Sequence, residues 1–289
     1  KRQIDTDCPM NNPLKTLLRL LPVVCLLCCT VTLHAQRVDT VEVFSPSMRK
    51  PVKNLVITPA DYDRQPGKRW PVVYLLHGYN NRYDGWLRKT KPELPASATA
   101  FGMIFVCPDG ATSWYLDSKV RAKSLYETFM TRELLPAVEE RYPVSRDRSG
   151  RAITGLSMGG FGAVSLAIRH KELFGAVGST SGGLDIRPFP ENWEIPQLLG
   201  TQAEHPEAWE AATPINLIPR IADGDLAIVI DCGYDDFFFG VNNDFHAELL
   251  RRGIMHDFYV RPGRHNNEYW GNSIDYQIVF FRNFFFRDK

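Results

Sequence analysis

The chain of 289 residues is long enough for one large domain or two small ones. A hydrophobic content of 44% and a charged content of 23% are typical of a globular protein with a packed core. The net charge of +1 gives no electrostatic reason to expect a nucleic acid or an anionic membrane as partner, so neither is predicted.

Residues 1–35 are predicted to be an N-terminal extension followed by a secretory signal peptide. Lys15 and Arg19 precede the apolar run LLPVVCLLCCTVTL, and Ala35 is a small residue beyond it. The run of about 14 residues is shorter than the about 20 that span a membrane. We therefore expect cleavage near Ala35, a secreted or periplasmic protein, and no stable membrane insertion of the mature domain, residues 36–289. A buried or membrane-anchoring helix is the alternative.

Two cysteines remain in the mature domain, Cys107 and Cys232, each at the end of an apolar run. Two cysteines make no disulfide framework, so both are expected to be buried thiols. No Cys/His group has zinc-binding spacing, and no metal or organic cofactor is implied.

Residues 36–289 alternate between short apolar runs and amphipathic stretches. Two alternating runs joined by a Pro/Ser turn predict an antiparallel strand pair at 38–44 and 53–59. Continuous apolar runs that end in turn residues predict strands buried on both faces of a parallel sheet, at 71–78, 102–110, 151–157, 176–182, 226–233 and 256–263. Helical patterns lie between them, at 123–141, 158–170 and 242–252. This alternation predicts one α/β domain with a mostly parallel, doubly wound sheet.

The stretch 183–222 departs from this pattern. It is too long for a bare connection between two strands, and it contains Phe189, Trp193, Trp209 and several prolines. We expect it to be either a functional segment or a small cap.

The sequence ITGLSMGGFGA (153–163) places Ser157 in a G-x-S-x-G motif, between a predicted strand and a predicted helix. That context is typical of a nucleophile elbow, a strained turn that lifts the serine hydroxyl above the sheet. Glycines at 155 and 159 would avoid collisions with the next strand and helix, and two further glycines would let the helix pack closely. We predict Ser157 as a nucleophile, with a merely glycine-rich turn as the alternative.

A serine nucleophile needs a base, and the base needs an acid that orients it. Behind such an elbow the chain order is Ser, acid, His. Of the seven histidines, His265 is favoured because it follows the last predicted strand, on a loop at the carboxyl edge of the sheet. Asp235 and Asp236 both follow the preceding strand, and spacing alone does not separate them.

An oxyanion hole needs two backbone N–H donors. Met158, the residue after the serine, is expected to supply one. Tyr79, on the loop after the strand that ends LLHG, is expected to supply the other. The alternative for His77 and Gly78 is a tight turn.

Aromatic residues accompany the predicted site. Trp114 and Tyr115 follow CPDG at the end of a strand, and Trp270 lies five residues beyond His265. Open α/β sheets bind ligands at the carboxyl ends of their strands, so these three are candidate substrate-binding residues. They favour flat aromatic acyl groups or sugar faces over long lipid chains, and packing in the core or rim is the alternative.

Over nearly the whole mature chain the sequence resembles the putative-esterase branch of the α/β-hydrolases. The resemblance lies in YLLHGY (74–79), CPDG (107–110), GLSMGGFGA (155–163), DCGYDDF (231–237) and PGRHNNEYW (262–270). It implies an α/β-hydrolase fold and Asp236, rather than Asp235, as the acid. It also supports the roles expected of Ser157, His265, Tyr79 and Met158.

That branch holds feruloyl and acetylxylan esterases, tributyrin esterases, S-formylglutathione hydrolases and mycolyltransferases. The formylglutathione hydrolases carry a different segment where this chain has LHGY, and the mycolyltransferases have an aspartate in place of His77. Together with the signal peptide, these departures favour the secreted esterases that act on carbohydrate esters.

We therefore expect a secreted serine carboxylesterase that hydrolyses short acyl or hydroxycinnamoyl esters through an acyl-enzyme. Its substrate would be a small-molecule or oligosaccharide ester, and no oligomeric state is predicted. The alternatives are an acyltransferase on the same triad, an S-formylglutathione-type thioester hydrolase, a peptidase, and a non-catalytic binding protein on this scaffold.

Overall fold

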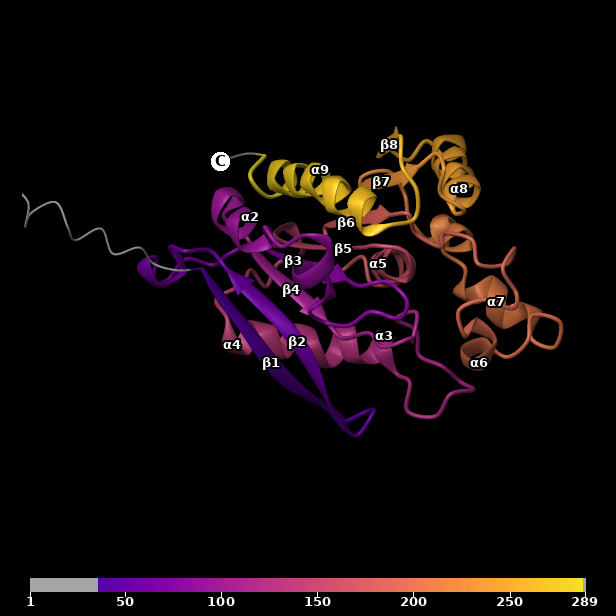
Figure 1. Ribbon diagram of the computed structural model, residues 1–289, viewed down its shortest axis with the longest axis horizontal. Helices are drawn as coiled ribbons and strands as arrows, with labels where there is room; N and C mark the ends of the chain where they lie inside the picture. Colours follow the sequence, from indigo (N-terminus) through magenta and orange to yellow (C-terminus); the bar gives the residue numbers. More distant parts are fainter. Residues whose placement is uncertain (1–35, 288–289) are drawn as a thin grey trace, which may run out of the picture. The chain divides into compact units, whose positions relative to one another are not determined.

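The computed structural model describes residues 36–287 (Figure 1). Contacts divide the chain into two units, Lys1–Ala35 and Gln36–Lys289, and all described residues belong to the second. The predicted signal peptide and its cleavage site lie outside the described residues.

One mixed sheet of eight strands organises the described domain, in the order β1-β2-β4-β3-β5-β6-β7-β8. β1 pairs antiparallel with β2, β2 pairs antiparallel with β4, and the remaining neighbours are parallel. The strands are β1 (Arg37–Ser45), β2 (Lys50–Thr58), β3 (Val72–Leu76), β4 (Ile104–Pro108), β5 (Arg151–Gly155), β6 (Ala176–Thr180), β7 (Ala227–Gly233) and β8 (Asp257–Arg261). The predicted α/β-hydrolase fold and its N-terminal antiparallel pair are confirmed.

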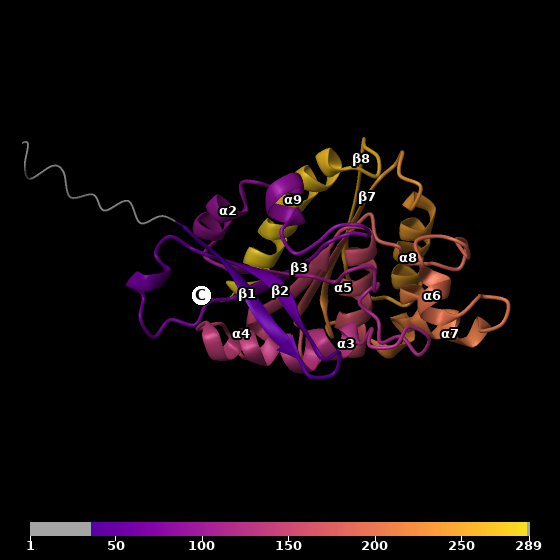
Figure 2. The same ribbon diagram turned by 60° about the horizontal axis from the view of Figure 1, so that its bottom comes forward.

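Helices cover both faces of the sheet (Figure 2). On one face α2 and α9 enclose one core, and on the other α4, α5 and α8 enclose a second. The α-helices are α2 (Leu94–Phe101), α3 (Tyr126–Thr128), α4 (Leu135–Arg141), α5 (Met158–Arg169), α6 (Ile195–Leu199), α7 (Pro206–Ala212), α8 (Phe239–Arg251) and α9 (Asn267–Phe285). Other helical turns are the 3-10 turns η1 (Tyr62–Arg64), η4 (Arg148–Gly150) and η5 (Pro214–Arg220), and the π-helical turns η2 (Trp86–Thr90) and η3 (Phe129–Leu134).

Burial along the strands follows their apolar runs. Every residue of β3, β4, β5 and β6 is buried, as predicted for strands covered on both faces. β8 differs from that prediction, because it is the edge strand beside β7 and none of its residues is buried. Its apolar side chains are partly exposed at the rim of the sheet.

The helix predicted at 123–141 is interrupted, since the π-helical turn η3 separates α3 from α4. The segment 183–222 contains α6, α7 and η5, so it is a small helical cap rather than a bare loop. Both cysteines of the described domain are buried free thiols, as expected. No helix between residues 36 and 287 has the length and apolar character needed to span a membrane.

Candidate active site

Ser157 occupies the sharp turn between β5 and α5. Its φ of 56° and ψ of −120° lie where non-glycine residues are strained. The turn is held from both sides, because the Ser157 N–H donates to the carbonyl of Thr180 and the Ser157 carbonyl accepts from Phe161. The strain therefore fixes the direction of the hydroxyl above the carboxyl edge of the sheet.

The glycines around Ser157 are required by close backbone contacts. A Cβ atom added to Gly155 would lie 2.4 Å from the carbonyl carbon of Gly159. One added to Gly159 would lie 2.2 Å from the carbonyl oxygen of Leu76, at the end of β3. The predicted steric reason for these two glycines agrees with this geometry.

A substitution separates this steric role from helix propensity. Gly159→Ala is expected to lower the free energy of unfolding by about 2–3 kcal/mol, because the backbone of β3 must move to admit the methyl group. Gly240→Ala is the matched control, since Gly240 is also in the first turn of a helix but has no atom within 4 Å of the added Cβ. It should raise stability by up to about 1 kcal/mol. Chemical denaturation of both variants checks this, and equal stabilities would contradict it.

His265 and Asp236 meet Ser157 at the carboxyl edge. His265, on the loop between β8 and α9, has its Nε2 2.9 Å from Ser157 Oγ. Its Nδ1 lies 2.9 Å and 3.0 Å from the two carboxylate oxygens of Asp236, on the loop after β7. A carboxylate only accepts, so Nδ1 carries the proton of the neutral ring and Nε2 is free to accept from the serine hydroxyl.

The neighbouring aspartates differ in position. Asp236 is buried, and its Oδ1 also accepts the N–H of Phe238 at 2.8 Å, which fixes the carboxylate plane. Asp235 is exposed to solvent. The structure thus brings Asp236, and not Asp235, to His265.

The two expected oxyanion donors lie on either side of the serine. Met158 is the first residue of α5, so its N–H has no intrahelical acceptor. Tyr79 follows Gly78, where an added Cβ would lie only 3.4 Å from the Cβ of Ser157. Among the described residues, neither N–H has a backbone or side-chain acceptor.

His77 holds the Gly78–Tyr79 peptide in place. Its ring is buried, Nε2 accepts the N–H of Gly110 at 2.8 Å, and Nδ1 lies 2.8 Å from the carbonyl oxygen of Gly78. Because Nε2 accepts, Nδ1 carries the proton and donates it to that carbonyl. The Gly78 carbonyl and the Tyr79 N–H belong to one planar trans peptide and point in opposite directions. His77 therefore orients the Tyr79 N–H, a role that sequence analysis missed although the LHG motif marked the position.

An aromatic wall of Phe237, Trp193 and Trp270 surrounds His265. The Phe237 ring is 4.2 Å from the imidazole, centroid to centroid, and is 52% exposed. It stacks on Trp193 at 5.6 Å with an interplanar angle of 20°. Trp270 meets the imidazole edge-on at 4.8 Å. Phe237 was missed in the sequence, where only the run of phenylalanines after the aspartates could have indicated it.

Trp114 and Tyr115, the other candidate substrate-binding residues, lie beneath this wall, and each is only 1% exposed. Trp114 Nε1 donates to the carbonyl of Trp193 at 3.1 Å. The Tyr115 hydroxyl donates to the carbonyl of His77 at 3.2 Å, and its ring covers Gly162 of α5. In this structure neither ring offers a surface to a substrate. Trp114 supports Trp193 of the wall, and Tyr115 supports His77.

Glu194 connects the cap to the oxyanion loop. Its carboxylate accepts from Arg121 at 2.7 Å and from Thr112 at 2.9 Å. The Tyr79 hydroxyl is a third hydrogen-bond partner. These bonds, that from Arg121 foremost, lower the pKa of Glu194. The carboxylate is therefore held ionised beside the loop that carries the Tyr79 N–H.

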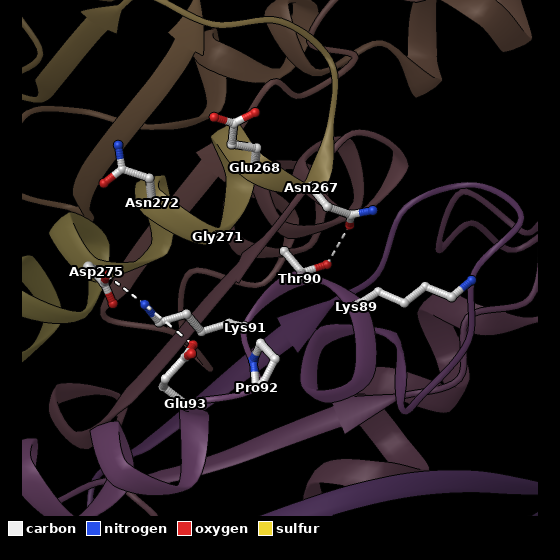
Figure 3. Close-up of a pocket in the computed structure, with 10 residues that line it drawn as sticks. All are labelled: Lys89, Thr90, Lys91, Pro92, Glu93, Asn267, Glu268, Gly271, Asn272 and Asp275. Carbon is white, nitrogen blue, oxygen red and sulfur yellow. Dashed lines mark hydrogen bonds and ion pairs between the residues drawn. The ribbon is translucent and has the colours of Figure 1, made fainter.

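A shallow polar depression of about 400 Å³ lies between the loop after η2 and the first turns of α9 (Figure 3). Its central cation is already paired, because Lys91 lies 2.7 Å from Asp275 and 3.9 Å from Glu93. Thr90 donates to Asn267 across it. Lys89, the other lysine of the depression, is drawn without a partner. Within residues 36–287, no group of three or more His, Cys, Asp or Glu side chains could hold a metal ion.

A serine elbow on a mostly parallel sheet, with an aspartate and then a histidine following along the chain, defines an α/β-hydrolase. Within that class the chain belongs to the family described as "Putative esterase", whose model matches residues 45–280.

Individual relatives agree with this assignment. The chain is 29% identical over 238 residues to an esterase of Mycobacterium tuberculosis, covering 73% of this chain but only 51%, about half, of that relative. It is 31% identical over 286 residues to the diacylglycerol acyltransferase/mycolyltransferase Ag85A of Mycobacterium leprae, covering 82% of this chain and 80% of the relative. The structure is similar to that of a ferulic acid esterase, with a TM-score of 0.75, 27% identity, and coverage of 87% and 99% of the two chains.

Proposed function

We propose that the protein is a serine carboxylesterase that hydrolyses short acyl or hydroxycinnamoyl esters of carbohydrates. The observation that carries the proposal is the hydrogen-bonded series Ser157–His265–Asp236 beside two backbone N–H groups that have no acceptor of their own. The proposal includes export, because residues 15–35 have the signal-peptide pattern, and N-terminal sequencing of protein found outside the cell checks this.

The geometry supports an acyl-enzyme mechanism. Ser157 Oγ attacks the ester carbonyl carbon while His265 Nε2 takes the hydroxyl proton. The Tyr79 and Met158 N–H groups hydrogen-bond the oxygen on which negative charge develops. Asp236 keeps the other ring proton on Nδ1 and stabilises the imidazolium.

The tetrahedral intermediate then collapses with cleavage of the bond to the alcohol oxygen. His265 gives its proton to that oxygen, and the alcohol leaves. A water molecule next transfers a proton to His265 and attacks the acyl carbon, and Ser157 takes the proton back as the acid is released. Each proton taken is returned, so the free enzyme is regenerated.

The aromatic wall supports a flat group beside the catalytic histidine. Phe237 contacts the His265 ring and stacks in turn on Trp193, so the two rings form a pair beside the histidine. Ring surfaces of this kind bind aromatic acyl groups by offset or edge-to-face contact, and they bind the apolar faces of sugars. The ferulic acid esterase that the structure resembles favours the aromatic acyl group.

Phe237→Ala tests this part of the proposal. It should lower the ratio of kcat/KM for methyl ferulate to kcat/KM for p-nitrophenyl acetate by roughly threefold to tenfold, the effect of one lost aromatic pair. Tyr234→Ala is the matched control, because Tyr234 lies on the same loop and is also 52% exposed, but makes no ring contact with His265. An unchanged ratio in Phe237→Ala, or a wild-type preference for long-chain triglycerides, would contradict the proposal.

Acyl transfer is the second candidate. It is favoured by the 31% identity to a protein described as an acyltransferase. The same acyl-enzyme would then be attacked by an alcohol in place of water, with His265 taking the proton of the alcohol. Product analysis with added sugar acceptors distinguishes the two, since hydrolysis alone gives only the free acid.

A further inference from the structure

A second cavity has a volume of about 440 Å³ and shares no lining residue with the catalytic triad. Its walls are the β1–β2 turn, the loop after β4, and the segment before α3. We propose that this cavity is a subsite for a carboxylate on the sugar part of the ester, that is, for a uronic acid residue of an acidic oligosaccharide. The inference rests on the proposed function and adds a charge preference to it.

The lining of the cavity has one sign of charge. Arg49, Lys50, Arg121 and Lys123, here called the basic subsite, line it, and no aspartate or glutamate does. In the part of the chain that the structure describes, the side chains of Arg49 and Lys123 have no partner. Lys50 donates to the hydroxyl of Tyr126 at 3.0 Å and lies 5.0 Å from the centre of that ring, but within residues 36–287 it has no carboxylate partner.

Positive charge is gathered locally at this cavity, because the whole chain carries a net charge of only +1. Like charges around one concave surface repel each other and raise the local concentration of anions. An anion that entered the cavity would relieve the repulsion and gain charge-assisted hydrogen bonds. The unpaired cations therefore favour a negatively charged ligand over a neutral one.

One residue, Glu194, connects the basic subsite to the loop that carries the proposed oxyanion donor. Arg121 binds Glu194, and Glu194 also contacts the hydroxyl of Tyr79, whose N–H is a proposed oxyanion donor. The first half of β2, which follows the β1–β2 turn, is held at the same edge, because the N–H of Asp109 donates to the carbonyl of Lys53 at 3.0 Å. Adjacent strands are about 4.8 Å apart, so β4 lies roughly 10 Å from β5, with β3 between them. A short oligosaccharide reaches this far from its esterified hydroxyl.

The remaining lining favours a sugar over a membrane headgroup. Thr112, Ser113, Ser124 and Tyr126 place hydroxyl oxygens beside the cations. The Thr112 and Ser113 hydroxyls already donate, to Glu194 and to the carbonyl of Gly110, so they can only accept from a ligand. The cavity is within the size range of small-ligand pockets, and none of its lining residues is an exposed large apolar side chain that could enter a lipid layer. A carboxylate with several neighbouring hydroxyls fits this combination of cations and hydroxyl oxygens.

The test compares two acetylated xylo-oligosaccharides that differ only in a glucuronate branch. The wild-type protein should show a kcat/KM about fivefold to tenfold higher for the branched acidic substrate at low salt, and high salt should reduce the preference. The double variant Arg49→Ala/Lys123→Ala should lose the preference. The measured quantity is the ratio of kcat/KM for the acidic substrate to kcat/KM for the neutral one in the same variant. A change in overall activity affects both values equally and therefore leaves the ratio unchanged.

Lys89→Ala is the matched control. Lys89 is an exposed cation that has no partner within the described domain, and it lines the polar depression rather than the basic subsite (Figure 3). This variant should keep the wild-type preference. Equal kcat/KM values for the two substrates in the wild type, a preference that survives in the double variant, or the same loss in Lys89→Ala would each overturn the proposal.

A binding measurement separates failure of the subsite from failure of the proposed function. Hydrolysis of p-nitrophenyl acetate tests the esterase alone, whereas calorimetry with trigalacturonate and neutral xylotriose tests the cavity without turnover. Binding of trigalacturonate that the double variant abolishes supports the subsite even if no ester is cleaved. Binding of inorganic phosphate or of anionic phosphatidylglycerol vesicles in place of trigalacturonate would overturn it.

Discussion

Ser157→Ala is expected to lower kcat by roughly 10⁵-fold to 10⁶-fold, because the members of a catalytic triad act as one unit and the nucleophile cannot be replaced. The fold should persist. The serine side chain makes its only side-chain hydrogen bond in the described domain to His265, and alanine can occupy the same strained turn. Hydrolysis of p-nitrophenyl acetate by the purified variant, with circular dichroism to check folding, is the measurement.

Ser165→Ala is the control for this change. Ser165 is a buried serine of the same helix, α5, whose hydroxyl has no partner among the described residues. Its substitution should leave turnover close to that of the wild type. A fluorophosphonate probe should label the wild type and Ser165→Ala but not Ser157→Ala. A folded Ser157→Ala variant with turnover within about tenfold of wild type would falsify the assignment.

Asp236→Asn should lower kcat by about 10³-fold to 10⁴-fold, because the imidazole of His265 would adopt the wrong tautomer. The Phe238 N–H donates to one oxygen of Asp236, so in the variant it would hold the amide oxygen and leave the NH₂ group facing His265. Nδ1 would then have to accept, which moves the ring proton to Nε2. Protonated Nε2 cannot take the proton of Ser157.

Asp235→Asn is the matched control, one residue away and exposed to solvent. It should change kcat by less than about twofold to threefold, since surface substitutions away from special contacts have small effects. Steady-state kinetics of the two variants decides between the aspartates. A larger loss in Asp235→Asn than in Asp236→Asn would reverse the assignment.

The sequence predicted the sheet well because its strands carry their signal locally. Each continuous apolar run ends in a turn residue. A strand buried on both faces can therefore be recognised from its own residues, without knowledge of the strands beside it. Helix α9 was not predicted, although its buried residues Ile274, Ile278, Phe281 and Phe285 follow the helical spacing. The pattern is masked because the apolar Tyr276 and Val279 are exposed, whereas the polar Ser273 and Gln277 are buried and bind Arg261 and Thr180. Tertiary contacts decide which of these side chains are buried.

The residues of the candidate site also differ in this way: the local sequence predicts some of them, whereas tertiary contacts position the others. Ser157 sits in a motif whose residues enforce their own turn, so the sequence alone located it. The choice between Asp235 and Asp236 depends on a turn in which the Asp235 N–H is bonded to the carbonyl of Gly263, a residue of the distant His265 loop. The positions of Trp114 and Tyr115 likewise depend on close packing against the cap and α5, which residue type does not reveal.

Both ring nitrogens of His77 are used inside the protein, and this has a consequence for the energetics of catalysis. The peptide that carries the Tyr79 N–H is fixed between two strand ends before any substrate arrives. Water around an ionising carbonyl has to reorient as charge develops, whereas a dipole locked in this way does not. The reorganisation was completed when the chain folded, so the proposed oxyanion hole is preorganised in the free enzyme and requires no closing lid.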